Sequence, residues 1–396
     1  MASPVARKIA EASGQGSWIR RMFEEGVRLK SIYGADQVCD LSIGNPNVEP
    51  PAEFHSALKE VLLDRTPGLH GYMPNAGYPH VREAVAAYLS REQGVEVAGS
   101  NVVMTVGAAG GLNIALKTIL DPGDEVVFTQ PYFVEYGHYV DNFQGVAKPV
   151  PASADFDLDL AAIDEAIGER TRAVLINSPN NPTGRVYPRE TLVTLGDLLR
   201  AKSRLFGRTV YLLSDEPYRR IVYDGMVVPP VFPVYENSLI VSSYSKELSL
   251  AGERIGYLAA HPGLAGVETL MQGLAFATRV LGFVNAPALM QRAVGRLQGV
   301  VVDMQTYERN RAVLLAGLVP AGYQIPAAEG GFYLFPRSPL SDDVAFVSEL
   351  AEHRVLGVPG IGFGTPGYFR LSYCVAPEVV DRALPVLCAL GKKYFA

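Results

Sequence analysis

Short apolar runs alternate with longer helical patterns from about residue 100 onward. Runs rich in β-branched residues lie at 101–106, 125–129, 173–177, 209–214, 239–243 and 255–259. Their continuous hydrophobicity is typical of strands that are buried on both faces. Between two of them, Leu192, Leu195 and Leu199 keep a helical spacing. This alternation predicts an α/β fold with a mainly parallel (mixed) sheet sandwiched by helices.

A glycine-rich segment separates the first strand from the helix that follows it. Residues 107–111 read G-A-A-G-G, and a helical pattern continues over 112–120 until a D-P-G-D turn. Glycines at this position are expected to break the strand before the helix begins.

The pattern changes after about residue 290. Helices are predicted over 303–319, 342–354 and 377–390, with strands over 331–335 and 369–373. Fewer strands predict a smaller α+β domain built from both chain ends. We therefore expect a large domain over 46–290 and a small domain over 1–45 and 291–396.

Composition narrows the function classes. The chain has 396 residues, a net charge of −6 and no clustered basic run, which argues against nucleic-acid binding. No apolar run is long enough for a membrane span, and the first residues lack the apolar stretch of a secretory signal. Three sparse cysteines and six scattered histidines predict neither disulfides nor a metal site. We expect a cytoplasmic protein.

Lys246 is the first candidate for chemistry. It follows the strand at 239–243 within S-Y-S-K, so it lies at the carboxyl end of a strand, where α/β sheets bind ligands. A lysine in that place can form a Schiff base if its amine is neutral. Taken alone, an exposed surface lysine is the commoner situation. An S-x-x-K nucleophile at Ser243 is set aside, because K-T-G is missing and S-D-E replaces S-D-N.

Two further polar motifs follow neighbouring strands. Asp215 opens D-E-P-Y, and its carboxylate can pair with a protonated ring nitrogen, while Tyr218 is within reach of the same ligand. The alternative is that Asp215 only caps a helix. Asn181 opens N-P-T-G, which is either an ordinary turn or a donor of an amide hydrogen bond.

Anion-binding candidates complete the set. Small residues at 107–111 allow a phosphate to approach a helix N-terminus, and Arg254 and Arg370 suit phosphate or carboxylate. Tight packing and surface ion pairs explain the same residues. The segment 362–367 matches G-x-G-x-x-G but precedes a strand and contains proline, so it does not indicate a dinucleotide site.

The order of these motifs along the chain resembles the class I and II aminotransferases, the fold type I enzymes of pyridoxal 5′-phosphate (PLP), typified by aspartate aminotransferase. The resemblance covers essentially the whole chain and rests on six motifs. They are S-I-G-N-P at 42–46, G-Y-M-P-N-A-G at 71–77, N-P-T-G at 181–184, D-E-P-Y at 215–218, S-Y-S-K at 243–246 and F-R-L-S-Y at 369–373.

The resemblance implies a role for each matching residue. Lys246 would hold PLP covalently and Asp215 would pair with its ring nitrogen. Arg370 would clamp the substrate carboxylate. The remaining implied contacts are Tyr218 and Asn181 on the phenolic oxygen; Phe133 on the ring face; Ala108, Ala109, Ser243, Ser245 and Arg254 on the phosphate; Asn181 and the Gly44 backbone on the substrate; and Tyr72 on the phosphate of a neighbouring subunit in a homodimer.

The sequence departs from the commonest family pattern in two places. The phosphate loop reads G-A-A-G where many relatives carry lysine, serine or threonine, so backbone N–H groups must contribute more. The stretch 275–286 lacks a Ser/Thr-rich character but carries Arg279. That arginine either crosses the dimer interface to a substrate carboxylate or forms a structural ion pair.

The activity implied by the resemblance is transamination between an α-amino acid and a 2-oxo acid, with glutamate and 2-oxoglutarate as one pair and ping-pong kinetics. A PLP-dependent C–S β-lyase on the same scaffold remains an alternative. A PLP-binding domain of a DNA-binding repressor is disfavoured, because the motifs already begin within the first 45 residues.

Overall fold

The structure has two bodies. A seven-stranded sheet forms the centre of the larger one. The computed structural model describes residues 4–10 and 18–395. The strand order is β2-β8-β7-β6-β5-β3-β4, and β8 alone runs antiparallel to its neighbours. The predicted fold class, a mixed and mainly parallel sheet between helices, is confirmed. The strands are β2 (Val102–Thr105), β3 (Glu125–Gln130), β4 (Val146–Pro151), β5 (Thr171–Asn177), β6 (Tyr211–Asp215), β7 (Ser238–Ser243) and β8 (Gly256–Ala260).

Strand β4 is the strand of the central sheet that the apolar pattern did not predict. It reads V-A-K-P-V-P and pairs only with β3 at the edge of the sheet. Most of its side chains are exposed or half-buried. A proline cannot donate to the ladder and is tolerated at an edge, where no second neighbour needs its N–H. Sequence hydrophobicity therefore gave no signal for it.

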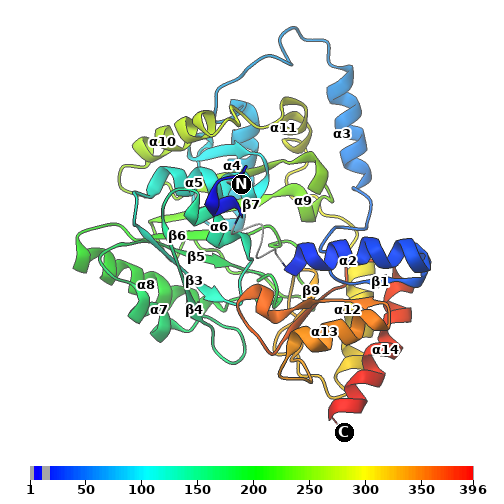
Figure 1. Ribbon diagram of the computed structural model, residues 1–396. Helices are drawn as coiled ribbons and strands as arrows, with labels where there is room; N and C mark the ends of the chain where they lie inside the picture. Colours follow the sequence, from blue (N-terminus) through cyan, green and yellow to red (C-terminus); the bar gives the residue numbers. More distant parts are fainter. Residues whose placement is uncertain (1–3, 11–17, 396) are drawn as a thin grey trace.

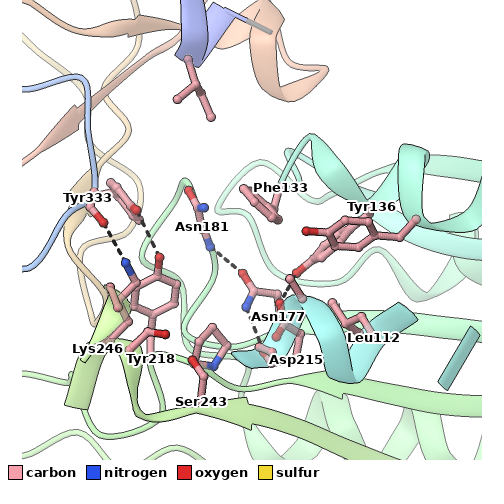
Figure 2. A pocket seen from close by; sticks show the side chains of 18 of the residues that line it. Leu112, Phe133, Tyr136, Asn177, Asn181, Asp215, Tyr218, Ser243, Lys246 and Tyr333 are labelled. Atoms are coloured by element: carbon pink, nitrogen blue, oxygen red, sulfur yellow. Dashed lines mark hydrogen bonds between the residues drawn. The ribbon is translucent and has the colours of Figure 1, made fainter. Parts of the chain in front are cut away.

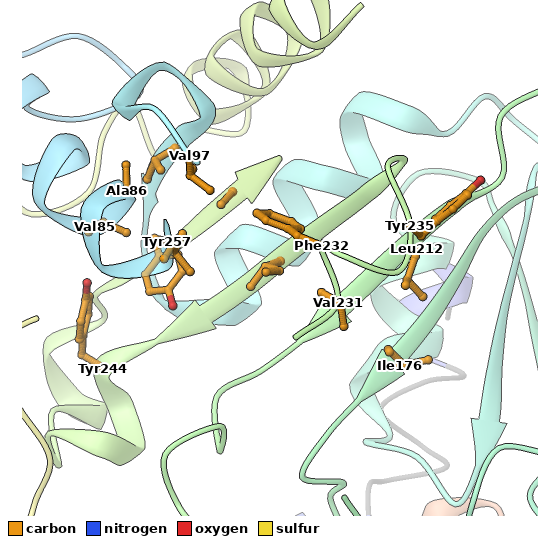
Figure 3. Packing of buried hydrophobic residues seen from close by; sticks show 14 of the residues in the cluster. Val85, Ala86, Val97, Ile176, Leu212, Val231, Phe232, Tyr235, Tyr244 and Tyr257 are labelled. Carbon is orange, nitrogen blue, oxygen red and sulfur yellow. The ribbon is translucent and has the colours of Figure 1, made fainter. Parts of the chain in front are cut away.

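Helices cover both faces of this sheet. Neighbouring residues of β5 point to opposite faces, so Val174 and Ile176 join one hydrophobic cluster while Ala173 and Leu175 join another. Helices α3, α4, α7, α8 and α11 pack in the first cluster, which Figure 3 shows in part, and α5, α6 and α10 pack in the second. The helices are α2 (Trp18–Tyr33), α3 (Ala52–Leu63), α4 (Pro79–Gln93), α5 (Gly107–Ile119), α6 (Glu135–Asp141), α7 (Leu160–Ala166), α8 (Arg189–Phe206), α9 (Tyr244–Glu247), α10 (Val267–Val280), α11 (Ala288–Val294), α12 (Gln305–Leu318), α13 (Asp343–Glu352) and α14 (Pro377–Phe395).

A third hydrophobic cluster combines residues from near both ends of the chain and forms the core of the smaller body. Helices α2, α12, α13 and α14 contribute residues to this cluster (Figure 1), and two small sheets, β1-β10 and β11-β12-β9, complete this body. Its strands are β1 (Cys39–Asp40), β9 (Tyr333–Leu334), β10 (Val355–Leu356), β11 (Val358–Pro359) and β12 (Phe369–Ser372). No helix in the described residues is long and apolar enough to cross a membrane.

The division into two domains stays a proposal, and packing suggests where its boundary belongs. Met290 and Leu297 are buried in the cluster of the larger body, whereas Val302 is buried in the cluster of the smaller one. The proposed division at residue 290 therefore fits the packing better if it is moved to about residue 300.

Strand β2 ends before the glycine-rich segment, as predicted, but the helix begins within that segment and not after it. Helix α5 begins at Gly107, whose φ of +74° is a backbone conformation that glycine adopts without strain. A Cβ at Gly111 would lie 2.6 Å from Cγ1 of Val241 on β7. Glycine is therefore required because the helix lies against the sheet here, and this tertiary contact outweighs glycine's poor helix propensity.

Replacing Gly111 with alanine tests this packing. We expect Gly111→Ala to lower the free energy of unfolding by about 1–3 kcal/mol, since Val241 is fully buried and cannot move aside. Urea denaturation measures the change. Gly137→Ala on α6 is the matched control, because a Cβ there meets nothing within 4 Å, and alanine should stabilise that helix slightly. Equal effects of the two substitutions would contradict the packing argument.

Candidate functional site

A cavity of about 300 Å³ opens at the carboxyl edge of the parallel strands. Asn177, Asp215 and Ser243 reach it from the ends of β5, β6 and β7 (Figure 2). The N-terminus of α5 forms one side, and the smaller body contributes Ile19, Tyr333 and Arg370. The cavity therefore lies where the two bodies meet.

The structure brings together nearly all the residues that the motifs singled out. Those that line the cavity are Gly44, Ala108, Ala109, Phe133, Asn181, Asp215, Tyr218, Ser243, Ser245, Lys246, Arg254 and Arg370. Tyr72 does not: it lies on the loop after α3, and its side chain is 92% exposed. Its expected contact is with a second subunit and stays a prediction.

Lys246 lies in the short helix α9, directly after β7. Its Nζ donates a hydrogen bond to the Gly44 carbonyl oxygen at 2.7 Å. The rings of Tyr218 and Phe332 lie 5.9 and 5.8 Å from Nζ. Burial lowers the pKa of the Lys246 amine to about 8, because water no longer solvates the charged form. A neutral, nucleophilic amine is therefore available near physiological pH.

Asp215 ends β6 and is buried. The Tyr136 hydroxyl donates to its Oδ2 at 2.6 Å, whereas its Oδ1 is buried and has no hydrogen-bond partner among the described residues. Burial raises the pKa of the Asp215 carboxyl to about 7, and the hydrogen bond from Tyr136 opposes that rise. An unpartnered carboxylate oxygen in a cavity is costly unless a ligand donates to it. A protonated ring nitrogen is a donor of the required kind.

A chain of hydrogen bonds joins Asp215 to Arg370. The Asn177 amide donates to the Asp215 carbonyl at 2.9 Å and accepts from the Asn181 backbone N–H at 2.7 Å. Arg370 Nη1 donates in turn to Asn181 Oδ1 at 3.1 Å. The strand ends and the arginine are therefore held in one network across the two bodies.

Arg370 is almost fully buried on β12. Its Nη2 donates to the Ser42 carbonyl at 2.6 Å, and the Tyr333 and Phe363 rings lie 4.3 and 4.8 Å from its Cζ. Burial lowers the pKa of the guanidinium, yet no carboxylate forms an ion pair with it in the described part of the chain. A buried, uncompensated arginine favours a carboxylate ligand.

A further group of lining residues suits a phosphate. Ala108 and Ala109 lie in the first turn of α5, where backbone N–H groups have no helical partner. Arg254 lies so close that a Cβ at Gly107 would be 2.7 Å from its Nη2. Ser243 and Ser245 line the same cavity. The arrangement places hydroxyls, a guanidinium and a helix N-terminus together.

Among the lining residues that the sequence analysis missed, three make hydrogen bonds to predicted site residues. Tyr136 and Asn177 contact Asp215, and the Tyr333 hydroxyl lies 3.1 Å from that of Tyr218. Asn177 ends a predicted strand, so its position was a usable signal. Tyr136 and Tyr333 belong to no motif, and only the fold brings them to the cavity.

Arg279 lies outside this cavity. It is on α10, and its guanidinium is 5.1 Å from the Phe276 ring. Both alternatives for this residue, a contact across a dimer interface and a structural ion pair, remain predictions.

Comparisons with known proteins agree with one another. Residues 36–387 match the profile of the family described as aminotransferase class I and II. The chain is 34% identical to an aspartate/prephenate aminotransferase of Thermus thermophilus, over 89% of this chain and 90% of that protein. It is 31% identical to a probable aspartate aminotransferase of Methanocaldococcus jannaschii, over 88% and 92%. A crystal structure of an amino transferase from Eubacterium rectale, 39% identical, superposes with a TM-score of 0.96 over the full length of both chains.

The lowered pKa of Lys246 is testable by chemical labelling. A small aldehyde trapped with cyanoborohydride should label Lys246 at a rate that rises with pH and is half-maximal near pH 8, because only the neutral amine reacts. Exposed lysines serve as the internal control, since an ordinary amine has a pKa of about 10.4. Peptide mass spectrometry follows each site. A half-maximal pH near 10 at Lys246 would show that its amine is well solvated.

Proposed function

The chain belongs to the class I and II aminotransferases, and from this premise we propose that it transfers amino groups between an α-amino acid and a 2-oxo acid on bound PLP. Glutamate and 2-oxoglutarate are proposed as one pair. The observation that supports this best is that the Lys246 amine and the unpartnered Asp215 Oδ1 belong to one cavity. The amine is suited to an aldehyde and the carboxylate oxygen to a ring nitrogen.

The residues of the cavity fit PLP at each of its polar groups. We assign Lys246 to the aldehyde and Asp215 to the ring nitrogen. The other assignments are Tyr218 and Asn181 to the phenolic oxygen; Phe133 to the ring face; and Ala108, Ala109, Ser243, Ser245 and Arg254 to the phosphate. We further propose a homodimer in which Tyr72, exposed within one chain, reaches the phosphate in the neighbouring subunit.

Arg370, Asn181 and the Gly44 backbone are assigned to the substrate α-carboxylate. The guanidinium fork of Arg370 matches a carboxylate in two parallel hydrogen bonds. The hydrogen bonds to Ser42 and Asn181 already hold the fork in place, so little rotational entropy is lost when the substrate binds.

Lys246 is assigned the proton transfer. When bound, PLP supplies an aldehyde that condenses with amines and a protonated ring that withdraws electrons from the substrate Cα. With its amine free, Lys246 would act as the base that takes up the proton of the substrate Cα and would later give that proton back. The first 2-oxo acid leaves before the second binds, which predicts ping-pong kinetics.

The test is to record the absorption spectrum of the protein with PLP and then to add single amino acids without any 2-oxo acid. We expect the visible band to convert to that of the aminated cofactor, and Lys246→Ala to abolish the conversion. The fastest donor identifies the substrate class. A band that persists while pyruvate and ammonia appear would instead support the β-lyase alternative. A protein that takes up no PLP would refute the proposal.

Arg370→Lys tests the carboxylate clamp. Lysine keeps the charge but loses the fork, so we expect kcat/KM to fall about 100-fold or more, mainly through a higher KM. Arg309→Lys is the control, because Arg309 pairs with Asp381 on the surface. Steady-state kinetics with several donors should give the same loss for each, since all share the α-carboxylate. A loss confined to one donor would place Arg370 at the substrate side chain.

A further inference from the structure

Tyr136 lies on α6, at the part of the cavity formed by the end of β6. It is only 2% exposed, and its hydroxyl donates to Asp215 Oδ2 at 2.6 Å (Figure 2). A short bond of this kind to an ionised oxygen is stronger than one between neutral groups. In the described part of the chain, the Tyr136 hydroxyl is the only side-chain group that is hydrogen-bonded to the Asp215 carboxylate.

The ring of Tyr136 has little freedom to move. It packs edge-on against Phe128, with centroids 5.9 Å apart, and against Phe133, with centroids 5.7 Å apart. Such contacts fix the ring plane and with it the position of the hydroxyl. The backbone of Asp215 is fixed as well, by the hydrogen bond from Asn177.

The Asp215 carboxylate therefore has one hydrogen-bonded oxygen and, among the described residues, one oxygen without a hydrogen-bond partner. Oδ2 accepts from Tyr136, while Oδ1 is buried and accepts no hydrogen bond from the part of the chain that the structure describes. Rotation of the carboxylate would break the bond to Tyr136. The orientation that presents Oδ1 as the acceptor for a ligand is therefore the one that Tyr136 stabilises.

We propose that Tyr136 is the positioning residue for the PLP ring: its hydroxyl orients Asp215 and keeps it ionised to receive the ring nitrogen. This inference rests on the proposed function and adds to it a residue that no motif contained.

The electrostatics of the site support the second part of this role. The titratable groups that interact electrostatically with Asp215 are Tyr136 and Tyr139 from α6 and Glu216, the residue that follows β6. Burial raises the pKa of Asp215 to about 7, the Tyr136 hydrogen bond lowers it, and the charge of Glu216 raises it. Without the hydroxyl, the pKa of Asp215 rises further, so the carboxyl is mostly protonated at pH 7 and cannot accept from a protonated ring. Above the raised pKa the carboxylate forms again.

Tyr136→Phe tests the proposal, because it removes the hydroxyl and keeps the ring. PLP binding is titrated by absorbance at pH 7 and at pH 9. We expect binding about 10-fold weaker than in the parent protein at pH 7. The difference should shrink at pH 9, where Asp215 is ionised in both proteins. Burial raises the pKa of Tyr136 well above 10, so the parent hydroxyl remains a donor at both pH values.

Tyr235→Phe is the matched control. Tyr235 is equally buried, donates to the Val210 carbonyl and lies outside the cavity. It should lose a similar amount of folding stability without any change in PLP affinity. Thermal unfolding of both variants separates lost stability from lost affinity, and a Tyr136→Phe protein whose affinity loss is the same at both pH values would overturn the proposed effect on ionisation.

Asp215→Asn supplies the second comparison, since asparagine cannot ionise. Tyr136→Phe added to Asp215→Asn should cause no further pH-dependent loss, because the two side chains act through one interaction. Additive losses would overturn the proposal. The two hypotheses fail separately: a parent protein that binds no PLP refutes the proposed function, whereas unchanged binding by Tyr136→Phe refutes only the role of Tyr136.

Discussion

Removing water from charged side chains at the carboxyl edge of the central sheet is the constraint on which the site depends. Burial shifts the pKa of Lys246 down to about 8 and that of Asp215 up to about 7. Arg370 is buried as well, and no carboxylate among the described residues forms an ion pair with it. Each buried charge costs free energy that a ligand of opposite polarity can offset. The cavity therefore favours a ligand that offers a hydrogen-bond donor to Asp215 and a carboxylate to Arg370.

Polar groups from both bodies hold these side chains in place. Gly44 and Ser42, which lie just after β1 of the smaller body, accept from Lys246 and Arg370. Asn177 and Asn181 link the end of β5 to Arg370 on β12. The lysine and the carboxylate come from the larger body, and the arginine comes from the smaller one. Any change in how the two bodies pack would therefore alter the distances within the site.

Local patterns identified much of this from sequence. Continuous apolar runs marked six of the seven central strands, because strands covered on both faces need such runs. Candidates at the strand ends, such as Asp215 and Lys246, followed from the rule that parallel sheets bind ligands at their carboxyl edge. Strand β4 was missed because most of its side chains are exposed or half-buried, so it has no continuous apolar run. Its prolines are tolerated because it lies at the edge of the sheet. The helical start at Gly107 was missed because it depends on close contact with β7 and β8.

The sequence by itself determined the fold class, the family resemblance and twelve residues that line one cavity, since each depends on neighbours in the chain or on ordered motifs. The tertiary structure alone decided that Tyr136 and Tyr333 join them. Tyr136 is 79 positions from its partner Asp215 in the chain, and Tyr333 is 115 positions from Tyr218, so each pair meets only after folding. It also decided the ionisation of Lys246 and Asp215. A pKa depends on what surrounds a group in three dimensions, and no local pattern records how much water the packed chain has excluded.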